Sequence, residues 1–210
     1  MKNISIAIQK KGHLKDESLI FLENLGIQYN PNQGLITTCP KTNINIILLR
    51  DDDIPNYVNN SLIDFGIIGE DIIKEKQDKI KIVRKLGFSK CKLILASPKK
   101  GNIKNIKDLQ NKRIATSYPN ILKKFLDKNG ITSTIIQVSG STEIAPQLDL
   151  SDAVCDLTQT GNTLRECGLE QFSLVTKSEA VLIQSPTNKL NKQSLLEKIR
   201  QYENNTISTI

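Results

Sequence analysis

The residues best suited to chemistry lie in the segment 152–164, which reads Asp-Ala-Val-Cys-Asp-Leu-Thr-Gln-Thr-Gly-Asn-Thr-Leu. A buried strand is predicted to end at Leu157, and a helix is predicted to begin near Thr163. Gly161 lets the backbone approach a ligand closely, and N–H groups at a helix N-terminus point at an anion. Thr160 and Thr163 add hydroxyl donors. The segment therefore favours a phosphate site, and a threonine-rich turn without a ligand is the alternative.

One aspartate beside this turn is a candidate for sugar recognition. Asp156 lies just before the turn, and its carboxylate can accept hydrogen bonds from ribose hydroxyls. Asp152 precedes the strand, and in the alternative without a ligand it is a structural residue. By themselves these residues predict a phosphorylated ligand that carries a sugar, and they do not specify a reaction.

Strands and helices are predicted to alternate along the chain. Apolar patterning predicts strands at 3–8, 35–38, 44–49, 65–69, 80–86, 92–97, 113–116, 131–138, 153–157, 172–176 and 180–183. Helical spacing, capping residues and terminating glycines predict helices at 16–24, near 55, at 71–76, 119–129 and 141–148, from 163 and at 193–202. This order predicts α/β architecture with mostly parallel sheets.

The length of 210 residues suits two small lobes. Boundaries are expected near 87–91 and 177–179, which gives a first lobe of residues 1–88 plus 179–210 and a second lobe of residues 89–178. Two lobes joined by two crossing segments leave a cleft, as in the type II periplasmic-binding-protein-like fold. Such a cleft is a favoured place for a small ligand.

Charge and cysteine usage exclude several classes of function. The net charge of +7 fits either nucleic-acid binding or a lysine-rich surface with an anionic small ligand. The lysines are scattered, and only five Phe and four Tyr are available to stack on bases, so the second interpretation is favoured. The four cysteines include no C-x-x-C pair and the one histidine is His13, which argues against zinc and against a histidine-dependent triad. We expect reduced thiols.

The chain shows no membrane or export signal by pattern. Its longest apolar runs are too short to cross a bilayer, and its first residues lack the apolar stretch and cleavage site of a signal peptide. We therefore expect a cytoplasmic protein without a membrane partner.

Seven stretches resemble, in order, motifs of the ATP phosphoribosyltransferase family. Residues 156–164 resemble the family's phosphoribosyl-pyrophosphate loop, usually Asp-Leu-x-x-(Thr/Ser)-Gly-x-Thr-Leu. The other six stretches extend the resemblance over about residues 4–185: 6–12 (Ile-Ala-Ile-Gln-Lys-Lys-Gly), 50–55 (Arg-Asp-Asp-Asp-Ile-Pro), 64–69 (Asp-Phe-Gly-Ile-Ile-Gly), 87–93 (Gly-Phe-Ser-Lys-Cys-Lys-Leu), 113–119 (Arg-Ile-Ala-Thr-Ser-Tyr-Pro) and 140–146 (Gly-Ser-Thr-Glu-Ile-Ala-Pro).

The resemblance implies a glycosyltransferase for the first step of histidine biosynthesis. In this reaction N1 of the adenine of ATP displaces pyrophosphate from phosphoribosyl pyrophosphate, and Mg²⁺ accompanies the pyrophosphate. The resemblance implies that phosphoribosyl pyrophosphate is bound by Asp152, Asp156, Thr158, Thr160, Gly161, Asn162, Thr163 and Leu164. It implies that ATP is bound on the first lobe by Lys10, Gly12, His13 and Arg50, and that the catalytic residues are Lys10, Arg50, Glu143 and Asp156. No metal-ligating side chains are expected.

Each of these assignments has a plainer alternative. In the alternative interpretation without a ligand, Lys10 is a solvated turn residue and Arg50 pairs with Asp52 or Asp53. Glu143 otherwise only caps its helix. For the whole chain the rivals are a non-enzymatic two-lobed protein that binds a small anion and a catalytically decayed copy with a structural role.

The sequence departs from the family where arginine is common, at His13, Gly34 and Leu48. Because arginine binds phosphate through a fork that other residues do not reproduce, we hypothesise weakened ATP or pyrophosphate binding, or compensation by a partner subunit. Long family members add a C-terminal histidine-binding domain, and short members work with a subunit resembling histidyl-tRNA synthetase. We expect this chain to lack the extra domain, as a short form or a shortened long form, and to form at least a homodimer.

Overall fold

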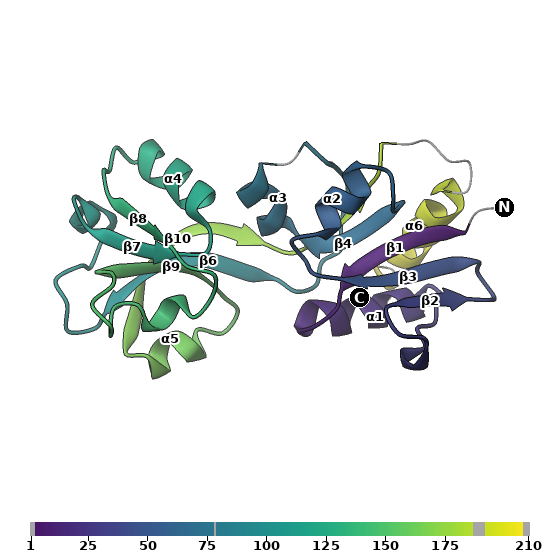
Figure 1. Cartoon of the computed structure of the whole chain (residues 1–210), viewed down its shortest axis with the longest axis horizontal. Coiled ribbons are helices and arrows are strands. Elements are labelled where there is room, and N and C mark those ends of the chain that lie inside the picture. Colours follow the sequence, from purple (N-terminus) through teal and green to yellow (C-terminus); the bar gives the residue numbers. More distant parts are fainter. Residues whose placement is uncertain (1–2, 78, 187–191, 208–210) are drawn as a thin grey trace. The chain divides into compact units, whose positions relative to one another are not determined.

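The chain folds into two compact units in the computed structural model, which describes residues 3–77, 79–186 and 192–207. Unit 1 comprises Met1–Ile73, Asp78–Ser89 and Glu179–Ile210, and unit 2 comprises Lys74–Gln77 and Lys90–Ser178. Each unit has its own mixed β-sheet with helices on both faces (Figure 1). Each unit therefore has its own hydrophobic core, as expected of a separate folding unit.

Unit 1 is built on a six-stranded sheet. The strand order is β2 (Ile36–Cys39), β3 (Ile44–Leu49), β1 (Ile4–Gln9), β4 (Phe65–Gly69), β11 (Ala180–Gln184) and β5 (Lys81–Lys85). Its helices are α1 (His13–Asn24), the 3-10 turn η1 (Pro31–Gln33), α2 (Ile54–Asn59), the first part of α3 (Glu70–Lys76), whose last three residues belong to unit 2, and α6 (Lys192–Ile207).

Alternation along β1 decides which helix covers which face of this sheet. Ile6 and Ile8 pack with α1 and α6, whereas Ala7 packs with α2 and α3. Successive side chains of a strand point to opposite faces, so β1 contributes to both hydrophobic clusters. Burying one such isoleucine contributes on the order of 1.5–3 kcal/mol, which makes this central strand a rigid support for the residues that follow it.

Unit 2 is built on a five-stranded sheet. The strand order is β10 (Leu169–Ser178), β6 (Cys91–Pro98), β9 (Ala153–Thr158), β7 (Arg113–Thr116) and β8 (Thr134–Gln137). Its other elements are η2 (Ile106–Leu109), α4 (Pro119–Lys128), η3 (Thr142–Ile144) and α5 (Asn162–Glu166). The amphipathic helix α4 buries Leu122 and Leu126 on one face of the sheet, and α5 buries Leu164 on the other.

The sheets are mixed, whereas the sequence predicted mostly parallel ones. Parallel pairing is confined to β3–β1–β4 and to β9–β7–β8, and the other neighbouring strands are antiparallel. Parallel neighbours need a long crossover, which helices such as α1 and α4 provide. The short turn at 40–43, which joins β2 to β3, provides no crossover, and these two strands are antiparallel.

One predicted helix, 141–148, is only the three-residue turn η3. Pro146 has no N–H to donate to the carbonyl of Thr142, so the α-helical ladder cannot continue. Two bonds of the tighter type form, from Ala145 N to Thr142 O (3.1 Å) and from Gln147 N to Ile144 O (3.0 Å), with a single bond of the α-helical spacing, from Leu148 N to Ile144 O (3.3 Å). None of the helices in the described part of the chain combines the length and apolarity needed to span a membrane.

Candidate active site

The loop predicted to bind phosphate joins β9 to α5 in unit 2. Gly161 is the N-cap of α5, with φ of 76°, a left-handed conformation that favours glycine. Its carbonyl accepts the N–H of Arg165 (3.2 Å), and the Thr160 hydroxyl accepts the N–H of Asn162 (3.4 Å). Apart from this contact, the first N–H groups of α5 have no partner within the helix, as at every helix start.

This loop lines a pocket of about 210 Å³ inside unit 2. The structure brings together eight of the residues predicted to take part in the reaction: Glu143, Asp156, Thr158, Thr160, Gly161, Asn162, Thr163 and Leu164. It adds Leu157 and Gln159, which the sequence reasoning did not single out although they lie within the same loop. A sugar phosphate is small enough for such a space.

Two carboxyl groups, those of Asp156 and Glu143, face this pocket. The pKa of Asp156 is raised to about 6: burial raises it most, the N–H of Leu157, which its carboxylate accepts at 2.8 Å, lowers it, and the charge of Glu143 raises it. A positive charge on a ligand in this pocket would favour the ionised form of Asp156 and be stabilised by it. Glu143 lies in η3, so the shortened helix still delivers it to the pocket.

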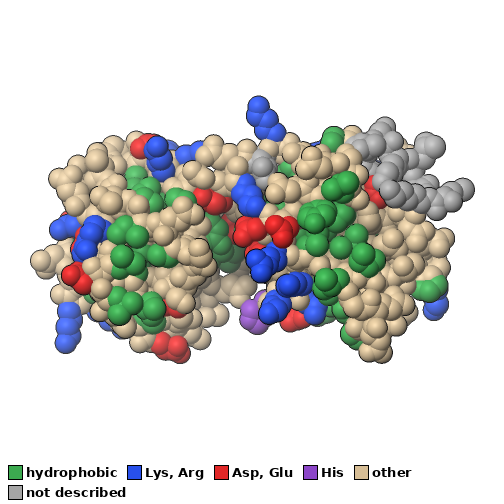
Figure 2. All heavy atoms as spheres, viewed as in Figure 1, with side chains coloured by type: hydrophobic (Ala, Val, Ile, Leu, Met, Phe, Trp, Pro, Cys, Tyr) green, Lys and Arg blue, Asp and Glu red, His purple; other side chains and the backbone are tan. Residues whose placement is uncertain are grey.

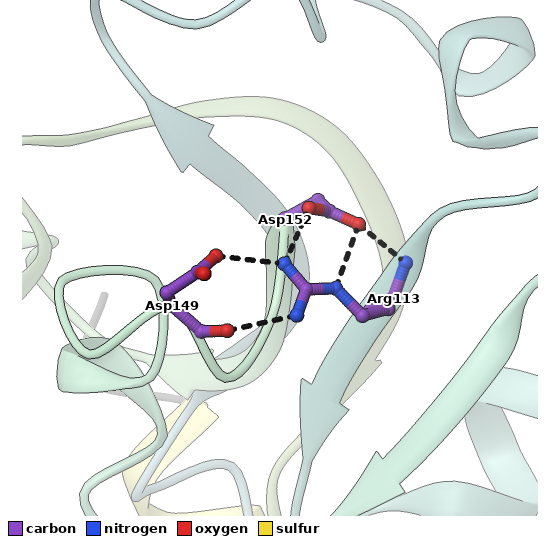
Figure 3. Close-up of polar contacts among 3 residues, drawn as sticks. All are labelled: Arg113, Asp149 and Asp152. Carbon is purple, nitrogen blue, oxygen red and sulfur yellow. Dashed lines mark hydrogen bonds and ion pairs between the residues drawn. The ribbon is translucent and has the colours of Figure 1, made fainter.

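Asp152 is not brought to the pocket. It lies immediately before β9, and the loop follows the last residue of that strand, about 20 Å away at the usual rise per residue. Its carboxylate accepts the backbone N–H of Arg113 (2.8 Å), and accepts Nε (3.3 Å) and Nη2 (2.9 Å) of the same side chain. Arg113 also donates to Asp149, through Nη1 to the carbonyl (2.8 Å) and Nη2 to the carboxylate (2.9 Å) (Figure 3).

These contacts assign Asp152 the structural role that the sequence left open. The hydrogen bonds from Arg113 hold the pKa of Asp152 below its ordinary value, so it stays charged and paired. The pair joins β7 to the start of β9, two neighbouring parallel strands. The Arg113–Asp152 pair thereby fixes β9 at its N-terminal end, whereas the pocket loop follows its C-terminal end.

The cationic residues predicted to bind ATP or pyrophosphate lie in unit 1. Gln9 and Leu49 are paired in the parallel register of β1 and β3, and Lys10 donates its N–H to the carbonyl of Leu49 (2.8 Å). Lys10 and Arg50 therefore follow neighbouring strands at the same carboxyl edge of the sheet. Such an edge is where α/β sheets usually bind their ligands.

Gly12 and His13 lie at the same edge, where α1 begins. Gly12 is the N-cap of that helix, with φ of 87°, and His13 is its first residue and is exposed. Nearby, Gln9 Nε2 donates to Asp51 (3.5 Å). The structure thus gathers the four residues predicted to bind ATP around one edge of unit 1.

The positions at which arginine is replaced also approach this edge. Leu48 donates its N–H to the carbonyl of Leu35, next to Gly34, and His13 begins α1. The Leu48 side chain, however, is buried in the hydrophobic core, so it does not extend the cationic surface. On the face of the molecule in Figure 2, basic side chains are interspersed with acidic ones, as expected of a solvated lysine-rich surface.

The fold and the pocket define a class: a two-unit α/β protein with a glycine-containing phosphate-type loop after a central strand. The sequence profile of HisG, ATP phosphoribosyltransferase, matches residues 50–203. The ATP phosphoribosyltransferase of Cytophaga hutchinsonii is 40% identical over 197 residues, covering 93% of this chain and 69% of that protein. That of Parabacteroides distasonis is 42% identical over 193 residues, covering 91% and 68%. The chain belongs to the ATP phosphoribosyltransferase family, as its motifs predicted.

Solved structures agree with this assignment. The ATP phosphoribosyl transferase (HisG:HisZ) complex from Thermotoga maritima has a chain 28% identical to this one, with a TM-score of 0.80 and coverage of 95% and 98% of the two chains. The structure of Tv2483 bound to L-arginine, at 13% identity and a TM-score of 0.66, shares the fold alone. The predicted α/β, periplasmic-binding-protein-like fold is confirmed by these neighbours.

Proposed function

We propose that this chain transfers the phosphoribosyl group of phosphoribosyl pyrophosphate to N1 of the adenine of ATP, releasing pyrophosphate in the first step of histidine biosynthesis. The observation that carries the proposal is the pocket around Gly161 in a member of this family. The pocket offers helix-terminal N–H groups and hydroxyls, which suit a phosphate, together with carboxylates, which suit a ribose. Both substrates are metabolites of the cytoplasm, where we place the reaction.

The loop of residues 160–163 binds the 5′-phosphate in this proposal. Backbone N–H groups do not move when the ligand arrives, so they hold the phosphate at little cost in reorganisation. The hydroxyls of Thr160 and Thr163 complete the contacts. Holding the phosphate fixes the position of the anomeric carbon relative to the carboxylates of the same pocket.

Asp156 acts at the ribose. The anomeric carbon gains positive charge as the bond to pyrophosphate breaks, as it does in glycoside hydrolysis, and a nearby carboxylate stabilises that charge. Asp156 also accepts hydrogen bonds from the ribose hydroxyls. Glu143 adds a second negative charge at the same pocket. Both functions require Asp156 in its ionised form.

Lys10 and Arg50 bind phosphates of pyrophosphate or of ATP. Their place at the carboxyl edge of β1 and β3 gives two cations on adjacent loops. The departing pyrophosphate is strongly anionic, so cations that contact it lower the barrier to its release. Adenine N1 is a neutral nucleophile and requires positioning more than activation.

Mg²⁺ is the metal we propose, carried to the enzyme on the pyrophosphate group. Within the described residues no cluster of three or more His, Cys, Asp or Glu side chains is arranged to hold a metal. In this proposal the ligands of the ion come mainly from substrate phosphates, as Mg²⁺ prefers. When bound, the ion neutralises charge on the leaving pyrophosphate.

We further propose that the chain works as a homo-oligomer and gains activity from a regulatory subunit. The Thermotoga maritima neighbour was solved as a HisG:HisZ complex. The absence of arginine at His13, Gly34 and Leu48 gives a reason for such help, because fewer guanidinium groups are available to bind phosphate.

Pyrophosphate release tests the function. Purified protein is mixed with ATP, phosphoribosyl pyrophosphate and MgCl₂, alone and with a candidate regulatory subunit, and pyrophosphate and the product's absorbance are followed. Release that requires both substrates supports the proposal. Turnover that occurs only with the added subunit supports the proposal that this chain needs a regulatory subunit for activity. Binding of both substrates without turnover under either condition would favour a decayed copy or a binding protein and would overturn the proposal.

A further inference from the structure

A second pocket lies in unit 1. It has a volume of about 690 Å³, which is within the range of small-molecule sites. One wall is the second half of α1, with Leu19 and Glu23. The opposite wall is the end of β2 and its turn, with Cys39 and Lys41, and the segment 28–33 closes the space between them.

This pocket is lined by none of the four residues proposed to bind ATP. β2 runs antiparallel to β3, and Cys39 pairs with Ile44, the first residue of β3. Arg50 follows the last residue of β3, so the end of the pocket at Cys39 is separated from Arg50 by the length of that strand, about 20 Å. The other end of the pocket, at Gln33, lies nearer to the carboxyl edge of β3, because Leu48 donates its N–H to the carbonyl of Leu35.

The walls of the pocket are fixed by hydrogen bonds within unit 1. The fully buried Thr37 donates its hydroxyl to the carbonyl of Asn30 (3.0 Å), and the N–H of Thr38 binds the side chain of Gln33 (3.0 Å). Lys15 lies over the ring of Tyr29, 5.8 Å from its centre. A site held in this way is formed before its ligand arrives, which reduces the entropy lost on binding.

The two walls differ in charge. The last turn of α1 carries Glu23 and no basic residue, so a carboxylate and the negative end of the helix lie on the same side. The turn wall carries Lys41. Burial raises the pKa of the Cys39 thiol, but the Thr42 hydroxyl and the backbone N–H groups of Gln28, Thr42 and Lys41 together lower the pKa below its ordinary value. That wall therefore favours negative charge.

We propose that this pocket binds a small zwitterion, up to the size of a dipeptide, with its ammonium group at Glu23 and its carboxylate at Lys41. A neutral pocket with one charged group of each sign rejects dianions and dications, because each would place a like charge against one wall. The amide and hydroxyl groups between the two walls bind the polar middle of the ligand. The site is independent of the proposed reaction.

The test uses the full chain and three probes of similar length: glycylglycine as the zwitterion, glutarate as the dianion and cadaverine as the dication. Amide chemical shifts are followed by NMR while each probe is added. The proposal expects glycylglycine to shift the amides of residues 28–41 and to leave those of residues 158–164 unchanged. It expects affinity at least about tenfold higher than for either other probe, the change given by losing one charge-assisted contact.

Variants test the assigned contacts. Glu23→Gln and Lys41→Met should each weaken glycylglycine binding by about tenfold. Asp16→Asn, an exposed acid on the same helix, and Lys10→Met, which does not line the pocket, should leave it unchanged. The dispersion of each variant's spectrum establishes that it is folded. Any one of three results would overturn the proposal. The first is the absence of chemical-shift changes with glycylglycine at 20 mM, about the weakest binding of interest. The others are equal binding of the three probes and unchanged glycylglycine affinity in Glu23→Gln and Lys41→Met.

Discussion

The loop after β9 and the edge after β1 and β3 are both placed to bind phosphate groups, but they do so by different means. In unit 2 the donors are backbone N–H groups and short hydroxyls, fixed by a left-handed glycine and a helix start. In unit 1 they are the long side chains of Lys10 and Arg50, which follow neighbouring strands. The first site selects by geometry, since its donors cannot move, and the second selects by charge.

This difference predicts where a single substitution is most harmful. A change in the rigid loop cannot be absorbed by rotation of a side chain, whereas the loss of one flexible cation leaves the other in place. The five predictions below follow that order, from the largest expected effect to the smallest.

The largest effect is expected from Gly161→Asp. It places a carboxylate beside the proposed phosphate site, where repulsion of a few kcal/mol corresponds to a loss of kcat/KM for phosphoribosyl pyrophosphate of about 100- to 1000-fold. The matched control is Gly168→Asp. Gly168 has the same left-handed conformation, with φ of 68°, but does not line the pocket. The backbone strain is common to both variants, so an equal loss in the two would contradict a phosphate site at Gly161.

The next effect concerns Asp156 and pH. Because its pKa is about 6 and the proposed role needs the ionised form, kcat/KM for phosphoribosyl pyrophosphate should rise with pH between about 5 and 7 and then level off. Asp156→Asn should lower the plateau by about 10- to 100-fold and remove that rise. Asp127→Asn, an exposed acid on α4, should behave as the parent protein does. A variant Asp156→Asn that retains the parent pH profile would exclude Asp156 as the titrating group.

Asp156 also predicts the sign of a stability change. Its pKa in the folded protein lies above the ordinary value of 3.8, so the folded state retains a proton that the unfolded chain loses. The stability that this proton contributes is complete below pH 4 and is lost as pH rises through about 6. At pH 8 the free energy of unfolding of Asp156→Asn should therefore exceed that of the parent by at most about 3 kcal/mol, which moves its urea midpoint to a higher concentration. At pH 4 the two proteins should unfold at similar urea concentrations.

A smaller effect is expected at the edge of unit 1. Arg50→Met and Lys10→Met should each lower kcat/KM by about tenfold, since each removes one charge-assisted contact to phosphate. Arg50→Lys should restore only part of this, because an ammonium group lacks the arginine fork. Lys11→Met, an exposed neighbour in the same turn, is the control for loss of charge. If Lys11→Met lowered kcat/KM as much as Arg50→Met and Lys10→Met do, the loss of general surface charge would explain the effect.

The smallest effect on activity is expected for Asp152. Asp152→Asn should leave KM for phosphoribosyl pyrophosphate within about twofold of the parent, while stability falls by about 1 kcal/mol, the upper end for partly exposed ion pairs. Steady-state kinetics and urea unfolding measure the two quantities separately. A large rise in KM without loss of stability would return Asp152 to the ribose site, as the family motif first implied.

The contrast between Asp156 and Asp152 also indicates what the sequence could predict. The strand, the glycine turn and the short helix of residues 153–166 are encoded by neighbouring residues, so their order and most of the residues that this segment contributes to the pocket could be predicted. The pairing of Asp152 with Arg113 joins residues 39 positions apart and depends on the register of β7 and β9. No local pattern encodes that register.

The sequence expectations also missed the shortened helix and the antiparallel strands. The spacing of residues 141–148 favours a helix, but Pro146, which is visible in the sequence, interrupts its hydrogen bonds. The antiparallel neighbours in both sheets depend on where each chain segment returns, which periodicity does not specify. Lys10 and Arg50 could be named from their motifs, yet their adjacency follows from the parallel pairing of β1 and β3.

The central claim is that residues 160–163 hold the 5′-phosphate of the sugar donor. A crystal structure of the chain with phosphoribosyl pyrophosphate and Mg²⁺ tests it most directly. We predict phosphate oxygens at about 2.7–3.2 Å from backbone nitrogens of this loop and ribose hydroxyls at Asp156. Donor bound elsewhere, with the loop making no contact to phosphate, would contradict the account.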